Sequence, residues 1–95
     1  MTQKKIEFTA VVTGPVEGYW LTVDGDGVLM DGITHMGTSL LASGAHSLQY
    51  FLRGASGSIA ISGVDTTSNI VVVTANGSII AGKRYGFGNK DFLVL

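Results

Sequence analysis

Residues 69–81 read Asn69-Ile70-Val71-Val72-Val73-Thr74-Ala75-Asn76-Gly77-Ser78-Ile79-Ile80-Ala81, and this stretch indicates the fold class. β-Branched residues fill both halves of it, and such residues favour strands. An Asn-Gly dipeptide between two apolar runs is the strongest short-range signal for a β-hairpin. We therefore expect a hairpin that turns at Asn76-Gly77. Because the first run is apolar without interruption, we expect its strand to be covered on both faces and central in a sheet.

Alternating patterns extend from this hairpin toward both ends of the chain. Residues 5–13 alternate apolar with polar side chains and end at Gly14-Pro15, where proline supplies no amide for a ladder. Residues 19–23 and 45–53 alternate in the same way, which directs Trp20 away from the core and His46 toward it. Further strands are expected at residues 28–30, 59–61 and 92–95, with a tight turn at Asp24-Gly25-Asp26-Gly27 and a mixture of short strands and loop over residues 31–44.

The chain contains a succession of strand-like segments and no helical pattern, which predicts an all-β protein. No segment repeats apolar residues at the helical spacing over three turns. Eight or nine short strands in 95 residues predict a small antiparallel two-sheet β-sandwich, Greek-key/immunoglobulin-like or jelly-roll-like, over residues 1–95 as a single domain. A small closed β-barrel is the alternative architecture.

The composition limits the classes of function. Charged residues make up only 14% of the chain, against about 25% in average globular proteins, and the net charge is −1. A broad electrostatic surface for nucleic acid or anionic lipid is therefore not expected. The chain has no cysteine, which excludes disulfides and thiol chemistry. We see neither a signal peptide nor a membrane span, and the sequence leaves the localisation open.

Residues 24–31 place three carboxylates among glycines, which resembles an oxygen-rich calcium loop at first inspection. An EF-hand loop requires an acid at position 5, glycine at 6 and glutamate at 12, and these positions hold Val28, Leu29 and His35. A hairpin turn built from Asp and Gly is the simpler interpretation. Calcium in another geometry, or zinc held by both histidines and an aspartate, stays open. The sequence thus predicts no metal site and leaves three candidate ligands: Asp24, Asp26 and Asp31.

Signatures of catalysis are incomplete. Gly54-Ala55-Ser56-Gly57 lacks the second spacing of a nucleophile elbow, and no helix is expected after it. Glu7 and Glu17 are expected on a solvent face and at a turn, which does not make them a pair for glycoside chemistry. We therefore expect a protein that is not an enzyme and that uses no cofactor.

The segment 82–90 interleaves basic and aromatic residues, a combination that stacks bases and neutralises phosphates. Lys83-Arg84-Tyr85-Gly86-Phe87-Gly88 resembles the aromatic strand of RNA-recognition and cold-shock modules, but only over these six residues. Its glycines favour a loop whose aromatic rings cap the core. An outward Trp20 would be a platform for a sugar or an anchor for a protein. The candidate partner-binding residues are Trp20, Lys83, Arg84, Tyr85, Phe87 and Lys90.

Three functions are consistent with these features. The first is a structural or assembly protein, or protein-interaction module, that presents sheet edges and faces to copies of itself or to another protein. The second is a carbohydrate-binding module that uses the exposed aromatic residues. The third is a nucleic-acid binder that acts through the basic and aromatic segment 82–90.

Overall fold

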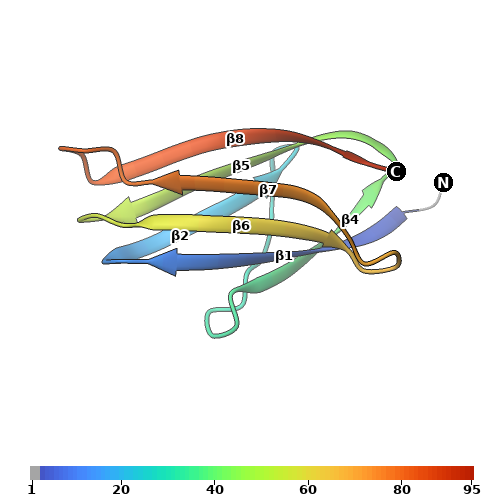
Figure 1. Ribbon diagram of the computed structural model, residues 1–95, viewed down its shortest axis with the longest axis horizontal. Coiled ribbons are helices and arrows are strands. Elements are labelled where there is room, and N and C mark those ends of the chain that lie inside the picture. Colours follow the sequence, from blue (N-terminus) through green and yellow to red (C-terminus); the bar gives the residue numbers. More distant parts are fainter. Residues whose placement is uncertain (1–2) are drawn as a thin grey trace.

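Two antiparallel four-stranded sheets lie face to face in the computed structural model, which describes residues 3–95 (Figure 1). Sheet A has the strand order β4-β1-β6-β7, and sheet B has the order β3-β2-β5-β8. The strands are β1 (Gln3–Thr13), β2 (Val16–Val23), β3 (Asp26–Gly27), β4 (Met36–Ala42), β5 (Gly44–Gly54), β6 (Ser58–Asp65), β7 (Ile70–Ser78) and β8 (Tyr85–Val94).

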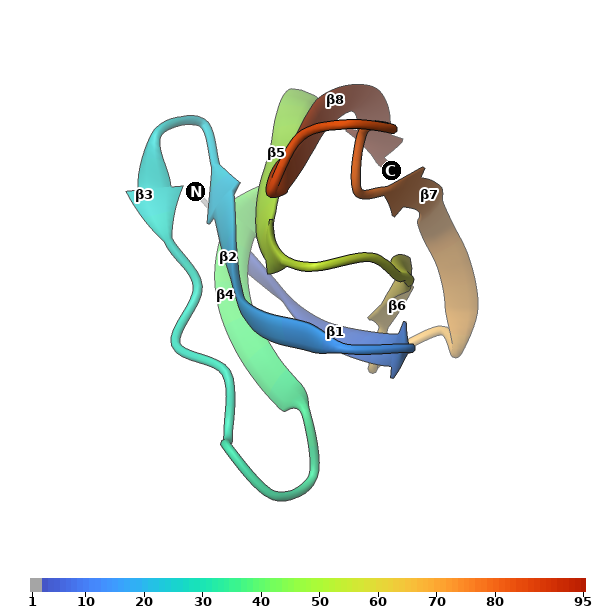
Figure 2. The same ribbon diagram turned by 90° about the vertical axis from the view of Figure 1, so that its left-hand side faces the viewer.

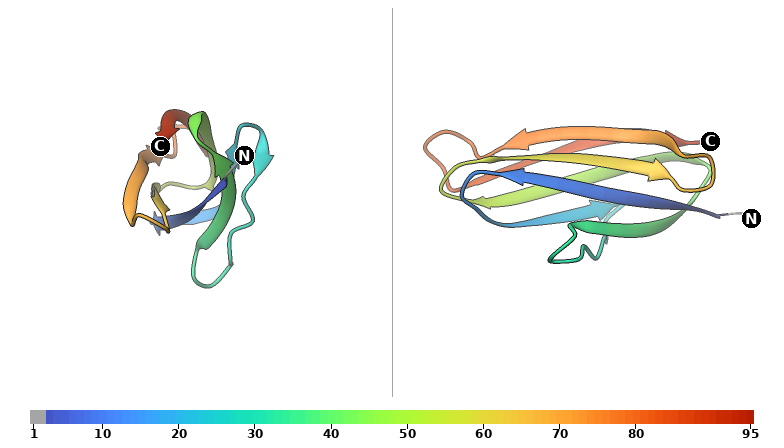
Figure 3. Two further views of the ribbon diagram at one scale, coloured as in Figure 1. Left: turned by 90° about the vertical axis from the view of Figure 1, so that its right-hand side faces the viewer. Right: turned by 60° about the horizontal axis from the view of Figure 1, so that its bottom comes forward.

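The sheets form an open sandwich and not a barrel. Strands β7 and β8 approach each other along one side of the molecule (Figure 2), but no backbone ladder among residues 3–95 joins the two sheets. The predicted all-β sandwich is confirmed, and the alternative of a closed barrel is wrong. The body measures 45 × 24 × 20 Å, with both chain ends at the same end of its long axis (Figure 3). No helix that could span a membrane occurs among the residues that the structure describes.

The core lies between the sheets and follows the alternation of the strands. Phe8 of β1 is fully buried and meets Phe92 of β8 edge to face, with the ring centroids 6.5 Å apart. Gly63 of β6 leaves the space that the Phe8 ring occupies. The buried apolar residues are Ile6, Phe8, Ala10, Leu21, Val23, Val28, Leu48, Leu52, Ile59, Ile61, Val73, Ala75, Phe92 and Val94.

The expected turn at Asn76-Gly77 is wrong. Strand β7 continues through both residues, with Gly77 paired to Ile59 of β6, and the chain reverses only over residues 79–84. Gly77 serves packing here, because the Tyr50 ring from sheet B occupies the space of a side chain at this position. The Tyr50 hydroxyl donates a hydrogen bond of 2.9 Å to the Asn76 carbonyl oxygen. Strand β7 is also an edge strand and not the expected central one, and β8 of the opposite sheet lies beside it.

The tight turn after β2 is confirmed, but the strand that follows it is shorter than expected. Asp24 and Gly25 take positive φ angles of 54° and 88°, as the hairpin turn requires. Strand β3 ends at Gly27, so the expected strand at residues 28–30 is wrong. The Val28 amide still donates a hydrogen bond of 2.9 Å to the Leu21 carbonyl oxygen, with both side chains in the core, and the chain leaves sheet B after it. Residues 31–44 contain one strand, β4, preceded by a loop, and the final strand starts at Tyr85 and not at residue 92.

A candidate binding face on sheet B

Three aromatic side chains form a row across the outer face of sheet B. Trp20 of β2 pairs in register with Phe51 of β5, and Phe51 pairs with Phe87 of β8. Their neighbours Leu21 and Leu52 point into the core, so the alternation of each strand turns the rings outward. Exposure is 52% for Trp20, 39% for Phe51 and 65% for Phe87. We call these three residues the aromatic row.

A fourth ring and a cation extend this row. Tyr85 lies two residues before Phe87 on the same face, and its ring lies 6.3 Å from Phe51 and 6.2 Å from Phe87, at interplanar angles of 7° and 18°. Trp20 and Phe51 are 5.5 Å apart at 52°. The Arg53 guanidinium carbon lies 5.8 Å from the Trp20 ring centroid, within cation–π range. The rings therefore form one contiguous surface.

A row of neutral polar side chains runs beside the aromatic row. Each residue of this row lies two positions from a ring of the aromatic row on the same strand. Its members pair in register with one another, and we call them the polar row: Thr22 of β2, Gln49 of β5 and Asn89 of β8. The Thr22 hydroxyl donates a hydrogen bond of 3.3 Å to Gln49 Oε1. Gln49 and Asn89 are exposed. Amides carry both donors and acceptors, so this row offers uncharged hydrogen bonding beside an apolar strip.

Two shallow hollows lie along the junction of the rows, one on each side of Gln49. The first, of about 230 Å³, is lined by Trp20, Thr22, Gln49, Tyr50 and Phe51. The second, of about 440 Å³, is lined by Gln49, Tyr50, Phe87, Gly88 and Asn89. Gly88 carries no side chain because Tyr50 fills the space behind it. The face thus has two adjacent depressions that share one amide.

The structure separates the aromatic from the basic residues singled out in the sequence. Residues 85–90 belong to strand β8, so the expected loop over residues 82–90 is wrong. Trp20, Tyr85 and Phe87 share the outer face of sheet B, and they do not cap the core. Lys83 and Arg84 lie in the preceding turn, and Lys90 lines a shallow groove beside β7.

Arg84 is engaged outside the aromatic row. Its Nη2 donates a hydrogen bond of 2.9 Å to Glu17 Oε2, with both side chains largely exposed. The Glu17 carboxylate neutralises the positive charge of Arg84 that would otherwise attract a phosphate. The basic residues of segment 82–90 are therefore not interleaved with its aromatic residues on one surface.

Four residues of this face were not predicted from the sequence as binding residues. They are Gln49, Phe51, Arg53 and Asn89. The alternation of residues 45–53 did place Phe51 opposite the core-facing residues. Strand pairing supplied the missing information, because β2, β5 and β8 are distant in sequence and adjacent in the sheet.

Two of the three candidate metal-binding carboxylates, Asp24 and Asp31, accept hydrogen bonds within the fold. Asp31 accepts hydrogen bonds from the Ile33 and Thr34 amides at 2.7 and 2.8 Å, and the Thr34 bond in particular lowers the pKa of Asp31. Asp24 Oδ1 accepts from the Ser47 amide at 2.9 Å. Among residues 3–95, no three His, Asp or Glu side chains converge as a metal site would require. The structure does not bring Asp24, Asp26 and Asp31 together.

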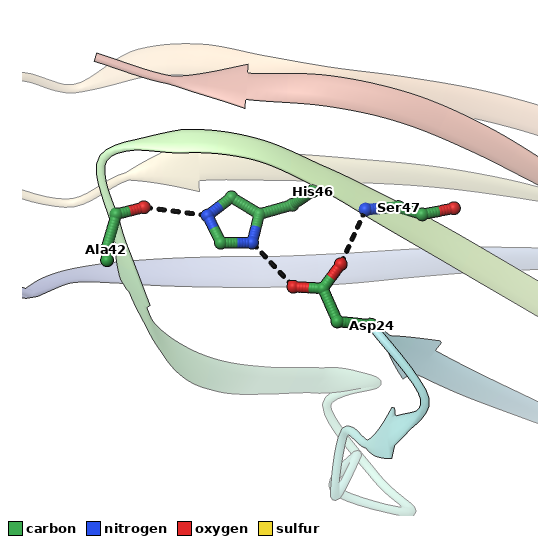
Figure 4. Close-up of polar contacts among 4 residues, drawn as sticks. All are labelled: Asp24, Ala42, His46 and Ser47. Carbon is green, nitrogen blue, oxygen red and sulfur yellow. Dashed lines mark hydrogen bonds and ion pairs between the residues drawn. The ribbon is translucent and has the colours of Figure 1, made fainter.

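His46 of β5 uses both of its ring nitrogens: one contacts Asp24 in the turn of sheet B that follows β2, and the other contacts Ala42 at the end of β4 in sheet A (Figure 4). Nδ1 donates to Asp24 Oδ2 at 2.6 Å, and Nε2 donates to the Ala42 carbonyl oxygen at 2.7 Å. Because both partners only accept, the imidazole satisfies both when it carries two protons. The hydrogen bond to Asp24 is the main cause that raises the pKa of His46, and the same bond lowers the pKa of Asp24. This pair is a structural tie.

A third hollow, of about 430 Å³, lies beyond Trp20, between β2 and the segment that follows β3. The Tyr19 hydroxyl donates a hydrogen bond of 2.7 Å to His35 Nδ1 at its margin, and burial raises the pKa of Tyr19. Both histidines are therefore hydrogen-bonded within the fold.

Comparison with protein-family models, with curated proteins and with solved structures finds no match to this chain.

Proposed function

We propose that this chain is a non-catalytic binding module that holds a neutral carbohydrate on the outer face of sheet B. The observation that carries this proposal is the register of the two rows, because it sets the aromatic row beside the polar row across three strands. Exposed aromatic rings cost solubility and contribute little to folding, so a contiguous set of them suggests a binding role.

The chemistry of the two rows suits a sugar. A pyranose ring has a face of C–H bonds, which packs on the electron-rich face of an aromatic ring. Its hydroxyl groups both donate and accept hydrogen bonds, as do the amides of Gln49 and Asn89. A ligand that lies across the junction of the rows would bury its apolar face and satisfy its hydroxyls in the same pose.

The size of the face favours a small ligand over a protein. Three strands spaced about 4.8 Å apart span about 10 Å, and three successive outward positions along a strand span about 14 Å. A stable protein–protein interface buries about 800 Å² on each partner, several times that footprint. An oligosaccharide of a few units matches it.

The placement of the cations supports a neutral ligand. Lys90 lies on the other side of β8 from Phe87, and Arg84 is paired with Glu17. Among residues 3–95, Arg53 is the one cation in cation–π contact with the aromatic row, and it lies against the Trp20 ring. The described residues place no row of cations along this face that could contact successive phosphates of a nucleic acid.

A glycan array followed by titration tests the proposal. Trp20 is the only tryptophan, so its fluorescence reports a ligand on this face. We expect Trp20→Ala to weaken binding by about 30-fold or more, the size of a binding hot spot. Val11→Ala, on the outer face of sheet A, is the matched control and should leave binding unchanged.

Two results would overturn the proposal. One is the absence of any bound neutral glycan, and the other is full affinity in the Trp20→Ala variant. A solution mass above 9.9 kDa that falls to the monomer value in Phe51→Asp would instead identify the face as a protein contact.

Self-association is a second candidate, favoured by the edge of β4 beyond Gly37, where the described residues provide no further strand beside it. The Asp31 amide donates to the Met36 carbonyl at 2.8 Å, so Met36 directs its backbone away from β1, and by alternation Thr38 and Leu40 do the same. Strand β4 contains no charge and no proline, the residues that usually block edge pairing. We propose that this edge pairs with the β4 edge of a second copy.

Light scattering over a hundred-fold range of concentration tests this second candidate. Leu40→Lys should lower the solution mass of an oligomer to that of the monomer, because a charged edge resists pairing. Val11→Lys, on the same outer face but in the interior strand β1, should leave the mass unchanged. A wild-type monomer at every concentration would exclude this function.

A further inference from the structure

We infer that the outer face of sheet B recognises an internal segment of a linear neutral glycan, two to three units long, laid across the strands from Trp20 to Phe87. This inference rests on the proposed carbohydrate function and specifies its ligand. Three features carry it: the straight line of the aromatic row, the pair of hollows beside that row, and the sheet edge and the third hollow at its two ends.

The aromatic row gives the direction of the chain. Trp20, Phe51 and Phe87 are direct register partners, so their Cα atoms lie on one line perpendicular to the strands. That line is about 10 Å long from the first strand to the third. Two linked pyranose rings in an extended chain have a similar length. A flat ribbon of equatorially linked sugars would lie along this line, whereas a coiled glycan would leave it.

The two hollows give the repeat. They lie on either side of Gln49, one toward Trp20 and one toward Phe87. Each hollow combines an aromatic wall with part of the polar row, so each would take one sugar unit in the same way. Two adjacent hollows of different volume but similar chemistry match successive units of one polymer.

Gln49 is the group that would contact both units. The Thr22 hydroxyl donates to Gln49 Oε1, which turns this oxygen toward β2. Because the amide is planar, its NH₂ group then points away from β2, toward the hollow next to Asn89. The oxygen keeps a second lone pair for a sugar hydroxyl on the Trp20 side. Gln49 is thus a specificity residue for two adjacent units.

Neither end of the row closes the path of a chain. Strand β8, which carries Phe87, is the edge strand of sheet B. At the other end β2 is paired with β3 only at Thr22 and Val23, and the third hollow leaves about 430 Å³ between Trp20 and the segment that follows β3. A site for a terminal sugar needs a wall directly against the last ring, whereas among residues 3–95 the row ends at a hollow on one side and at a sheet edge on the other. An internal segment can continue in both directions.

The test is the dependence of affinity on chain length, measured by calorimetry and by Trp20 fluorescence. The probes are oligomers of one to six units of β-1,4-linked glucose, xylose, mannose and N-acetylglucosamine. Oligomers of α-1,4-linked glucose serve as the coiled control, and oligogalacturonate serves as the charged control. We expect affinity for at least one β-1,4 series to rise about tenfold per unit up to the trimer and then to level off. Reduction of the chain end should leave the affinity for the hexamer unchanged.

Variants separate the role of Gln49 from general damage to the face. Gln49→Leu should weaken binding of the trimer about five- to tenfold, the loss of one or two hydrogen bonds, and binding of the monomer much less. Gln3→Leu, an exposed glutamine on sheet A, should change neither affinity.

The outcomes distinguish the inference from the function on which it rests. Binding that is equal for all lengths, that needs a free chain end, or that prefers the α-linked or charged series would overturn the inference and leave carbohydrate binding in place. Failure of every probe to bind, with no glycan retained on the array, would overturn both.

Discussion

The two outer faces of the sandwich obey the same alternation and carry different side chains. On sheet A the outward positions include half-buried Glu7, Thr9 and Ser62, with single aliphatic residues such as Val11 and Leu40 among them. On sheet B the equivalent positions hold the aromatic row. Since both sheets bury their other face in the same core, folding alone does not require rings on one outer face. The gathering of rings on one face alone is the main support for the proposed binding face.

The largest effect should come from the core that both faces share. Phe8→Ala removes a fully buried ring between the sheets, and we expect a loss of about 3–5 kcal/mol in the free energy of unfolding. Both sheets of this variant should then unfold together in a single transition with urea. Two separate transitions would show that the sheets are independent units, and the comparison of two faces on one scaffold would fail.

A smaller effect should come from the contact between the sheets beneath the polar row. Gly77→Ala places a methyl group against the Tyr50 ring, and we expect about 1–3 kcal/mol of destabilisation from overpacking. Tyr50→Ala in the same chain should recover part of that loss. Additive effects in the double variant, measured by denaturation, would mean that the cost at Gly77 does not arise from Tyr50.

The pair of His46 and Asp24 at one end of sheet B should make stability depend on pH. The pKa of His46 is raised, so its contribution is complete below its unfolded pKa of about 6.5 and is lost as the pH rises through the folded value. The pKa of Asp24 is lowered, so its contribution is complete above its unfolded pKa of about 3.9 and is lost as the pH falls through the folded value. We expect a maximum between about pH 4 and 6.5, with a decline of at most about 1 kcal/mol toward pH 9 because the pair is partly exposed.

His46→Phe is the control for this pH effect. Urea unfolding of this variant between pH 5 and 9 should lack the decline on the alkaline side. A decline of equal size in the variant would assign the effect to other groups.

The smallest effect on stability should come from the aromatic row itself. Phe51→Thr gives sheet B a residue typical of sheet A, and we expect a loss of only about 0.2–1 kcal/mol from its cross-strand pairs. Glycan binding should fall by about tenfold or more in the same protein. A large loss of stability with unchanged binding would place Phe51 in the framework of the fold and not in its function.

Much of the architecture follows from local patterns. The alternation in residues 5–13 and 45–53 predicts two strands and the inward side of each, and the structure confirms both. Asp24-Gly25 predicts its turn because few other residues adopt two consecutive positive φ angles. The alternation of residues 19–23 predicts that the Trp20 side chain points away from the core, and its exposed position confirms this.

The failures occur where a distant residue overrides a local preference. Asn76-Gly77 has the composition of a turn, but the Tyr50 ring needs the space that Gly77 leaves, so the strand continues. Strand β3 ends after two residues, and beyond Val28 the chain turns toward sheet A, where the Asp31 amide bonds the Met36 carbonyl oxygen of β4. No local pattern contains the first of these contacts, because Tyr50 and Gly77 meet only when the sheets pack.

By itself the sequence determined the class of fold, the inward and outward sides of most strands, and the outward ring of Trp20. These properties depend on the two-residue period of a strand, which any short segment already shows. The tertiary structure alone decided that Trp20, Phe51 and Phe87 form one row, that Gln49 lies between two hollows, and that Arg84 pairs with Glu17. Such neighbourhoods depend on the order and register of β2, β5 and β8, and packing of the whole core fixes that register.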